Sequence, residues 1–139
     1  MLQNRAFLLL ARSRCAKYST NVELTRVRYP HVKRGHYGSI TDNDLKFFES
    51  LLGANRVITD STELEGYNTD WLNTVRGESK IVLRPKTTEE VSAVVGHCIN
   101  QNLAICPQGG NTGLVGGSVP VFDEVILSTS LMDKIEGIS

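Results

Sequence analysis

The order of apolar and polar positions predicts three buried strands and one helix between residues 80 and 127. Residues 81–83, 103–106 and 125–127 are short apolar runs, as in strands that are covered on both faces. Between the first two runs, apolar residues recur at helical spacing: Val91, Val94, Val95, Cys98 and Ile99. This order indicates a strand–helix–strand unit with a right-handed crossover, followed by a third strand.

Two positions have the spacing of a capping box, in which a threonine side chain caps a helix and a carboxylate three residues later reaches back. Thr41 with Asp44 predicts one helix start, and Thr87 with Glu90 predicts another. The first helix is expected to end at Gly53, and its apolar face is formed by Leu45, Phe47, Phe48, Leu51 and Leu52.

The remaining segments upstream of residue 80 have little periodicity. Residues 21–39 contain Pro30 and scattered charges, which predicts an extended arm. Residues 57–58 are expected to form a short strand and residues 61–66 a helical turn. Residues 67–76 are expected to form an irregular connector, with Trp71 and Leu72 packed inward.

The first twenty residues have the composition of a mitochondrial transit peptide, because they are rich in arginine and contain no acid. A secretory signal fits less well, because its apolar stretch would span only residues 6–11. The third alternative is an amino terminus without a targeting signal. We therefore divide the chain into a transit peptide (residues 1–20), an arm with a helical extension (residues 21–74) and a domain that contains the strand–helix–strand unit (residues 75–139), which the resemblance described below identifies as a truncated FAD-binding domain. The mature protein is expected in the mitochondrial matrix.

Composition excludes several classes of protein. The chain has 15 basic and 15 acidic residues, but four of the basic ones lie in residues 1–20, so the remainder is mildly acidic and does not suit nucleic acid. No apolar run reaches the roughly 18 residues of a membrane span. Cys98 and Cys106 follow apolar patterns and are expected to be reduced core residues. His97 is expected to be solvated, and we expect neither a metal site nor a catalytic residue.

Residues 107–120 contain five glycines and carry the candidate chemistry. Glycine allows positive φ and a close approach of the backbone, so this loop can direct several N–H groups at an anion or a dinucleotide. The spacing does not match a GxGxxG fingerprint or a lysine-containing P-loop, which argues against nicotinamide and ATP. The alternative is a glycine-rich turn that binds nothing.

One segment resembles the flavin-binding loop of the vanillyl-alcohol oxidase and p-cresol methylhydroxylase superfamily: PQGGNTGLVGGSVPVFDEVILS, with YNTDW and LRPKT upstream. Within it, the closest resemblance is to FAD-dependent D-2-hydroxyacid dehydrogenases that act on D-2-hydroxyglutarate or D-lactate. The resemblance implies an α+β fold: a p-cresol methylhydroxylase-type FAD-binding domain, of which this chain carries only part of the first subdomain. It also implies oxidation of a D-2-hydroxy acid, preferably D-2-hydroxyglutarate, with electrons passed to an electron-transfer flavoprotein.

The resemblance places the FAD diphosphate on the backbone of this loop, with the Thr112 and Ser118 hydroxyls as side-chain donors. The cofactor-binding residues that it implies are Pro107, Gln108, Gly109, Gly110, Asn111, Thr112, Gly113, Leu114, Gly116, Gly117 and Ser118. Asn111 stands where some relatives carry a flavin-linked histidine, so FAD is expected to be noncovalent. Two alternatives stay open: a fragment without catalysis that binds a nucleotide or a partner at an open sheet edge of residues 125–127, and a marginally stable product.

Overall fold

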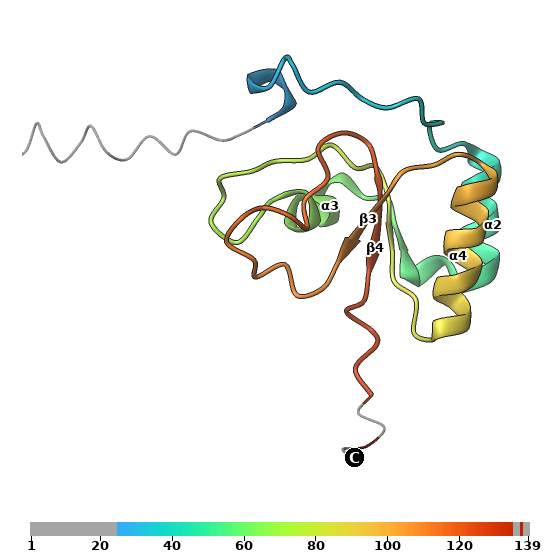
Figure 1. The fold of residues 1–139 in the computed structure, drawn as a ribbon. Helices are drawn as coiled ribbons and strands as arrows, with labels where there is room; N and C mark the ends of the chain where they lie inside the picture. Colours follow the sequence, from blue (N-terminus) through green and yellow to red (C-terminus); the bar gives the residue numbers. More distant parts are fainter. Residues whose placement is uncertain (1–24, 135–136, 138–139) are drawn as a thin grey trace, which may run out of the picture.

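The computed structural model describes residues 25–134 and 137, so the transit-peptide prediction lies outside the described residues. The chain order is η1 (Arg26–Arg28), α2 (Asp42–Leu52), η2 (Ala54–Arg56), β1 (Val57–Ile58), α3 (Ser61–Asn68), β2 (Val82–Leu83), α4 (Thr88–Asn100), β3 (Ile105–Gln108) and β4 (Val125–Ser128). Helices α2 and α4 lie together on one side of the strands and α3 lies on the other (Figure 1). None of the described helices is long and apolar enough to cross a bilayer.

The sheet has four strands in the order β1-β2-β4-β3. Strand β4 is parallel to both of its neighbours, whereas β1 is antiparallel to β2. The predicted strand–helix–strand unit is therefore present, but its two strands are separated by β4. The expectation of an open edge at residues 125–127 was wrong, since β4 lies between two strands and all four of its residues are buried.

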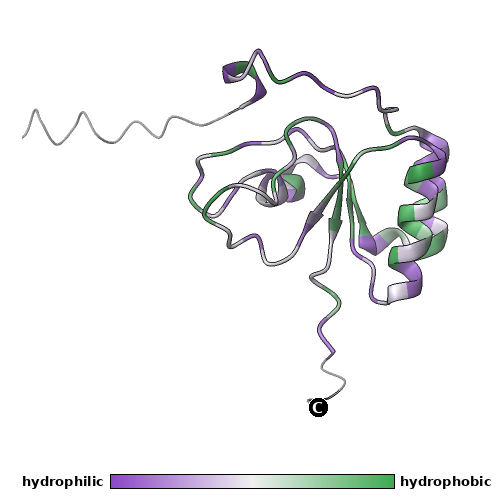
Figure 2. Ribbon diagram, viewed as in Figure 1, coloured by the Kyte–Doolittle hydropathy of each residue, from purple (hydrophilic) through white to green (hydrophobic). Residues whose placement is uncertain are grey.

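Alternation along the strands divides the core between the two faces of the sheet. Ile81, Leu83, Val125 and Leu127 pack with α2 and α4 in the larger cluster. Val82 and Ile126 point to the opposite face, where they pack with residues of α3 and β1. Figure 2 shows the apolar colour concentrated along the strands and the facing sides of the helices. Continuous apolar runs in the sequence thus correspond to strands that are covered on both faces.

Helix α2 begins with the predicted capping box. The amide of Asp44 donates to the Thr41 hydroxyl, and the Asp44 carboxylate accepts hydrogen bonds from the Thr41 amide at 2.9 Å and its hydroxyl at 2.6 Å. The helix ends at Gly53, which has a φ of 89°. The other oxygen of Asp44 lies 2.8 Å from Nε2 of His97 on α4. The capping carboxylate therefore also connects the two helices.

The prediction that His97 is solvated was wrong. Its ring is stacked on Phe47 at a centroid distance of 4.0 Å and meets Phe48 edge-on at 5.0 Å. Together with the contact to Asp44, these rings fix the side chain between α2 and α4. The apolar pattern of α4 could not predict the contact of His97 with Asp44, because Asp44 lies 53 residues earlier in the chain.

At the start of α4, the predicted capping box forms only by half. The Thr87 hydroxyl accepts from the amide of Glu90 as expected. The Glu90 carboxylate instead accepts from the amide of Lys86 and forms a two-pronged ion pair with Arg56, at 2.6 and 2.8 Å. Glu90 therefore connects the start of α4 to Arg56 in η2. Ile99, expected on the apolar face, is 71% exposed.

The connector after α3 is also irregular, as predicted, but Trp71 and Leu72 do not pack inward. Trp71 is 67% exposed and Leu72 is exposed as well. The buried residue is Asp70, whose carboxylate accepts from the amides of Thr74 and Val75 at 2.6 and 2.7 Å. Burial opposes ionisation of Asp70, but these hydrogen bonds outweigh it and lower its pKa. An ionised side chain therefore forms the interior of this connector, and the aromatic residue lies outside.

The amino-terminal arm is extended apart from η1, and it crosses the molecule to reach the end of the glycine-rich loop (Figure 1). Arg34 donates to both oxygens of Asp123, at 2.5 and 3.2 Å, and also to the carbonyls of Tyr37 and Gly38. One guanidinium therefore holds the arm against the residues that precede β4.

Two glycines allow the glycine-rich loop to lie against the connector. A Cβ atom at Gly77 would overlap the carbonyl oxygen of Pro120. A Cβ atom at Gly116, which has a φ of 67°, would lie 2.7 Å from Cγ2 of Val75. Because neither place has room for a side chain, these glycines determine how closely the two segments pack.

We predict that Asp44→Asn lowers the free energy of unfolding at pH 7 by about 1–3 kcal/mol, because a buried hydrogen-bonded charge is lost. Burial opposes the ionisation of Asp44, but hydrogen bonds from Thr41 and His97 lower its pKa below the unfolded value of about 3.9. The ionised carboxylate therefore stabilises the fold above that value, and the stabilisation is lost as the pH falls through the lower folded pKa. Urea denaturation between pH 7 and pH 3 measures both effects.

The exposed Asp42 in the same helix turn provides the control, and Asp42→Asn should change stability less, by about 0.3–1 kcal/mol. If Asp44→Asn lost stability in acid as steeply as the wild type, Asp44 would not contribute to the acid sensitivity.

We further predict that Gly77→Ala destabilises the fold by about 1–3 kcal/mol, because the added methyl group forces the connector and the loop apart. Gly117→Ala is the matched control: nothing lies within 4 Å of a Cβ there, so its effect should stay within about 0.5 kcal/mol. Thermal melting of the two variants measures the difference, and equal melting temperatures would contradict the close contact at Pro120.

Candidate functional site

The glycine-rich segment starts inside the sheet. Pro107 and Gln108 are the last residues of β3, so the loop itself runs from residue 109 to residue 124, where β4 begins. It leaves the carboxyl end of a parallel strand, which is the edge where ligands bind in open α/β sheets. The loop passes beside the carboxyl end of α3 and the connector that follows it. This places the candidate site between the loop and residues 66–77.

The loop has an accessible backbone with few internal hydrogen bonds. Within the described residues, no backbone N–H from Gly110 to Ser118 donates to another group of the protein. A Cβ atom at Gly113 or Gly117 would meet nothing within 4 Å, so the backbone can be approached closely there. No acidic residue occurs between Cys106 and Asp123. Free N–H groups in a segment without acids suit a phosphate.

Three polar side chains of the predicted site bind the protein itself. Nε2 of Gln108, which is 3% exposed, donates to the carbonyls of Tyr67 and Ser118, each at 2.9 Å. Nδ2 of Asn111 donates to the carbonyl of Thr69 at 2.7 Å, and the Ser118 hydroxyl donates to Oδ1 of Asn111 at 2.7 Å. Ser118, expected to donate to a ligand, therefore has another acceptor in this structure.

The other predicted site residues are Pro107, in β3, and residues of the outer part of the loop. The exposed ones are Pro107, Gly109, Gly110, Thr112, Gly113, Leu114 and Gly117, whereas Gly116 is half-buried. The Thr112 hydroxyl is thus available to a ligand, and Leu114 adds an apolar side chain at the tip. The structure brings all of these residues together in one continuous loop.

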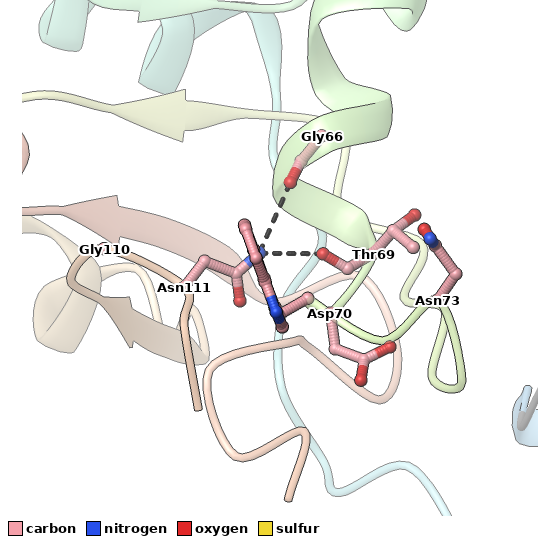
Figure 3. Close-up of a pocket in the computed structure, with 7 residues that line it drawn as sticks. Gly66, Thr69, Asp70, Asn73, Gly110 and Asn111 are labelled. Carbon is pink, nitrogen blue, oxygen red and sulfur yellow. Dashed lines mark hydrogen bonds between the residues drawn. The ribbon is translucent and has the colours of Figure 1, made fainter. Parts of the chain in front are cut away.

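A hollow of about 320 Å³ lies between the loop and the end of α3. It is lined by Gly66, Thr69, Asp70, Trp71, Asn73, Gly110 and Asn111. Figure 3 shows Asn111 reaching from the loop to the carbonyls of Gly66 and Thr69, with Asp70 and Asn73 on the connector. The lining of this hollow includes an acid, Asp70, whereas the loop contains none between Cys106 and Asp123. The free loop amides therefore suit a phosphate better than the hollow does.

The connector side of the site was not predicted from the sequence. Asn68 and Ser79 are both buried and exchange two hydrogen bonds, from Nδ2 of Asn68 to the Ser79 carbonyl at 2.9 Å and from the Ser79 amide to Oδ1 of Asn68 at 2.8 Å. The amide of Gly77 also donates to the carbonyl of Asn68. The sequence YNTDW was the available signal, since it contains three polar residues that prove to be buried: Asn68, Thr69 and Asp70.

The titratable groups near the loop do not form a nucleophilic or metal-binding cluster. Burial raises the pKa of the Cys98 and Cys106 thiols to about 11, so both are protonated at neutral pH. Both are free and buried, as expected for reduced core cysteines. Within residues 25–134, no three histidine, cysteine, aspartate or glutamate side chains gather at a position that could hold a metal ion.

Residues 79–139 match the family model described as FAD binding domain. The chain is 56% identical over 117 residues to the mitochondrial D-2-hydroxyglutarate dehydrogenase of Rattus norvegicus, covering 84% of this chain and 22% of that protein. It is 60% identical over 99 residues to the enzyme of the same name from Danio rerio, covering 71% of this chain and 18% of that protein.

Among solved structures, p-cresol methylhydroxylase with substrate bound superposes with a TM-score of 0.59 at 28% identity, over 72% of this chain and 21% of that chain. The chain thus spans about a fifth of the length of the curated relatives that it matches. Those relatives are mitochondrial by name, which supports a mitochondrial location. Sequence and fold together show that this chain carries part of an FAD binding domain of the p-cresol methylhydroxylase type, in a form similar to that of the D-2-hydroxyglutarate dehydrogenases.

Proposed function

We propose that residues 107–118 hold the diphosphate of FAD noncovalently, mostly through backbone N–H groups. The observation that carries this proposal is the row of free amides from Gly110 to Ser118, in a loop without acidic residues. The open space at Gly113 and Gly117 allows a phosphate to approach the backbone. The exposed Thr112 hydroxyl adds a donor, and the match of residues 79–139 to an FAD binding domain supports the identity of the cofactor.

Noncovalent binding follows from the chemistry of position 111. A carboxamide is not a nucleophile toward flavin, and Asn111 already donates to the carbonyls of Thr69 and Gly66. FAD supplies the hydride acceptor when it is bound. The residues of this chain contribute binding and orientation, and we place no catalytic residue among them.

For the whole protein, we propose oxidation of D-2-hydroxyglutarate to 2-oxoglutarate in the mitochondrial matrix, with an electron-transfer flavoprotein as electron acceptor. Support comes from identities of 56% and 60% to D-2-hydroxyglutarate dehydrogenases. D-lactate is the alternative substrate, and residues outside this chain are expected to discriminate between the two.

A second candidate function is binding of a partner protein without catalysis. Its support is an exposed apolar surface on the two adjacent segments, with Trp71 and Leu72 on the connector and Leu114 and Val115 on the loop. Val115 is 90% exposed, and exposed groups of large apolar residues indicate interaction sites.

The FAD proposal is tested with the purified 139-residue chain, by absorbance of bound flavin and by titration with FAD. Gly113→Asp and Gly113→Asn add side chains of the same size at a place with open space, and they differ only in charge. We expect Gly113→Asp to bind FAD about tenfold or more weakly than Gly113→Asn at low salt, because the carboxylate repels the diphosphate.

ADP should displace the bound FAD and riboflavin should not, since only ADP carries the diphosphate. If the wild-type chain bound no flavin, the loop would not be a cofactor site in this chain. Equal affinities of the two Gly113 variants would place the diphosphate elsewhere.

The proposed substrate is tested with the full-length protein and a dye acceptor. We expect kcat/KM to be about tenfold or more higher for D-2-hydroxyglutarate than for D-lactate, since a site built for a second carboxylate leaves a buried charge unpaired with the smaller acid. The L enantiomer provides the control for stereochemistry. A preference for D-lactate would assign the protein to the alternative substrate.

A further inference from the structure

Helix α3 ends without the usual means of satisfying its last carbonyl groups. It runs from Ser61 to Asn68, its C-cap residue is Thr69 rather than glycine, and its last turn contains no basic residue. The carbonyls in the last turn of a helix have no partner within the helix and need donors from elsewhere. Burial of Asn68 and Thr69 keeps water from supplying all of them.

Side chains of the glycine-rich segment supply several of these donors, and the amide of Gly77 supplies another, to the carbonyl of Asn68. Gln108 donates from Nε2 to the carbonyl of Tyr67 at 2.9 Å. Asn111 donates from Nδ2 to the carbonyl of Thr69 at 2.7 Å and, more weakly, to that of Gly66 at 3.4 Å. Two carboxamides that follow β3 therefore cap a helix more than forty residues earlier in the chain.

The same two carboxamides also tie the loop to itself. Gln108 donates from Nε2 to the carbonyl of Ser118 at 2.9 Å, which joins the start of the loop to residue 118. The Ser118 hydroxyl donates to Oδ1 of Asn111 at 2.7 Å. Asn111 has a φ of 53°, a left-handed conformation that asparagine adopts more readily than most residues. The free amides lie between these tied points.

We propose that Gln108 and Asn111 are positioning residues: by capping α3, they hold the glycine-rich loop in one conformation before the cofactor arrives. The inference rests on the proposed function for its consequence, but the ligand-free conformation of the loop can be tested by itself. In this scheme neither side chain contacts the cofactor. Ser118 acts through Asn111 rather than as a donor to the diphosphate.

Preorganisation matters here because the loop lacks other means of order. Its amides from Gly110 to Ser118 make no hydrogen bond within the described part of the chain, and glycine-rich backbone has much conformational entropy to lose. A loop that is ordered only on binding loses affinity by that cost. When Gln108 and Asn111 cap α3, the loop loses this conformational entropy during folding rather than on binding. The helix requires these donors whether or not a cofactor is bound.

Asn111→Asp and Gln108→Glu test the proposal, since each keeps the shape of the side chain and replaces the donor NH₂ by an oxygen. Aspartate also tolerates a left-handed φ, so the backbone at residue 111 is not strained. We expect amides of residues 109–118 and of the last turn of α3 to exchange hydrogen about tenfold or more faster in each variant without ligand. Unchanged exchange in both variants would overturn the proposal.

Two control variants separate positioning from a general loss of stability. Val121→Ala shortens an exposed side chain on the same loop, outside residues 107–118. Glu90→Gln weakens the ion pair with Arg56 at the start of α4, away from the loop. Both controls should leave exchange in residues 109–118 unchanged, although Glu90→Gln should lower the melting temperature. Faster loop exchange in Glu90→Gln would show that the loop responds to any destabilisation, which would overturn the specific role.

FAD titration then measures the consequence, with fluorescence of Trp71 as the reporter. Trp71 is the single tryptophan of the chain and lines the hollow beside Asn111. At a salt concentration that screens the added charge, we expect Asn111→Asp to weaken FAD binding about tenfold or more, and Val121→Ala and Glu90→Gln to bind as the wild type does. Faster loop exchange with undiminished FAD affinity would overturn the positioning role.

If the wild-type chain bound no FAD, the proposed function would fail, and hydrogen exchange in the ligand-free variants would still decide whether Gln108 and Asn111 order the loop.

Discussion

The arrangement of this protein depends on one constraint, the insertion of β4 between β2 and β3 in a parallel sheet. Because β3 and β4 are parallel, the chain must return from the carboxyl end of one to the amino end of the other. An α-helix usually makes such a crossover and satisfies its own backbone hydrogen bonds. Here the return is a glycine-rich loop without a helix, so its polar groups need partners from other segments.

Those partners come from α3 and the connector that follows it. The loop makes few hydrogen bonds within its own backbone, and α3 lacks a glycine cap, so Gln108 and Asn111 satisfy a need of the helix while they hold the loop. Gly77 and Gly116 allow the segments to approach closely enough for these contacts. The amides that stay free are then available at the edge of the sheet. Incomplete hydrogen bonding of this crossover is thus what makes it suitable for an anionic ligand.

The sequence predicted the elements better than their arrangement. Apolar runs report whether a strand is buried on both faces, and β2 and β4 were found where such runs occur. Those runs do not report strand order, so β4 was expected at an edge. The capping box at Thr41 was predictable because both partners are three residues apart, whereas the contact of Asp44 with His97 spans 53 residues. Trp71 was misplaced because apolar character was taken as burial, although Asp70 forms the interior of the connector.

For the candidate site too, the sequence identifies chemical groups but not their partners in the fold. Composition identifies the donors in a segment, and the glycine-rich loop could be located from them without a structure. Composition does not show which donors are already engaged. The Ser118 hydroxyl and the Asn111 carboxamide looked available to a ligand, yet each has an acceptor within the protein. Because a buried carbonyl without a donor is costly, such side chains are engaged by the fold first. Apart from the Thr112 hydroxyl, the donors left for a cofactor are therefore the backbone N–H groups, which every sequence contains and whose freedom only a structure reveals.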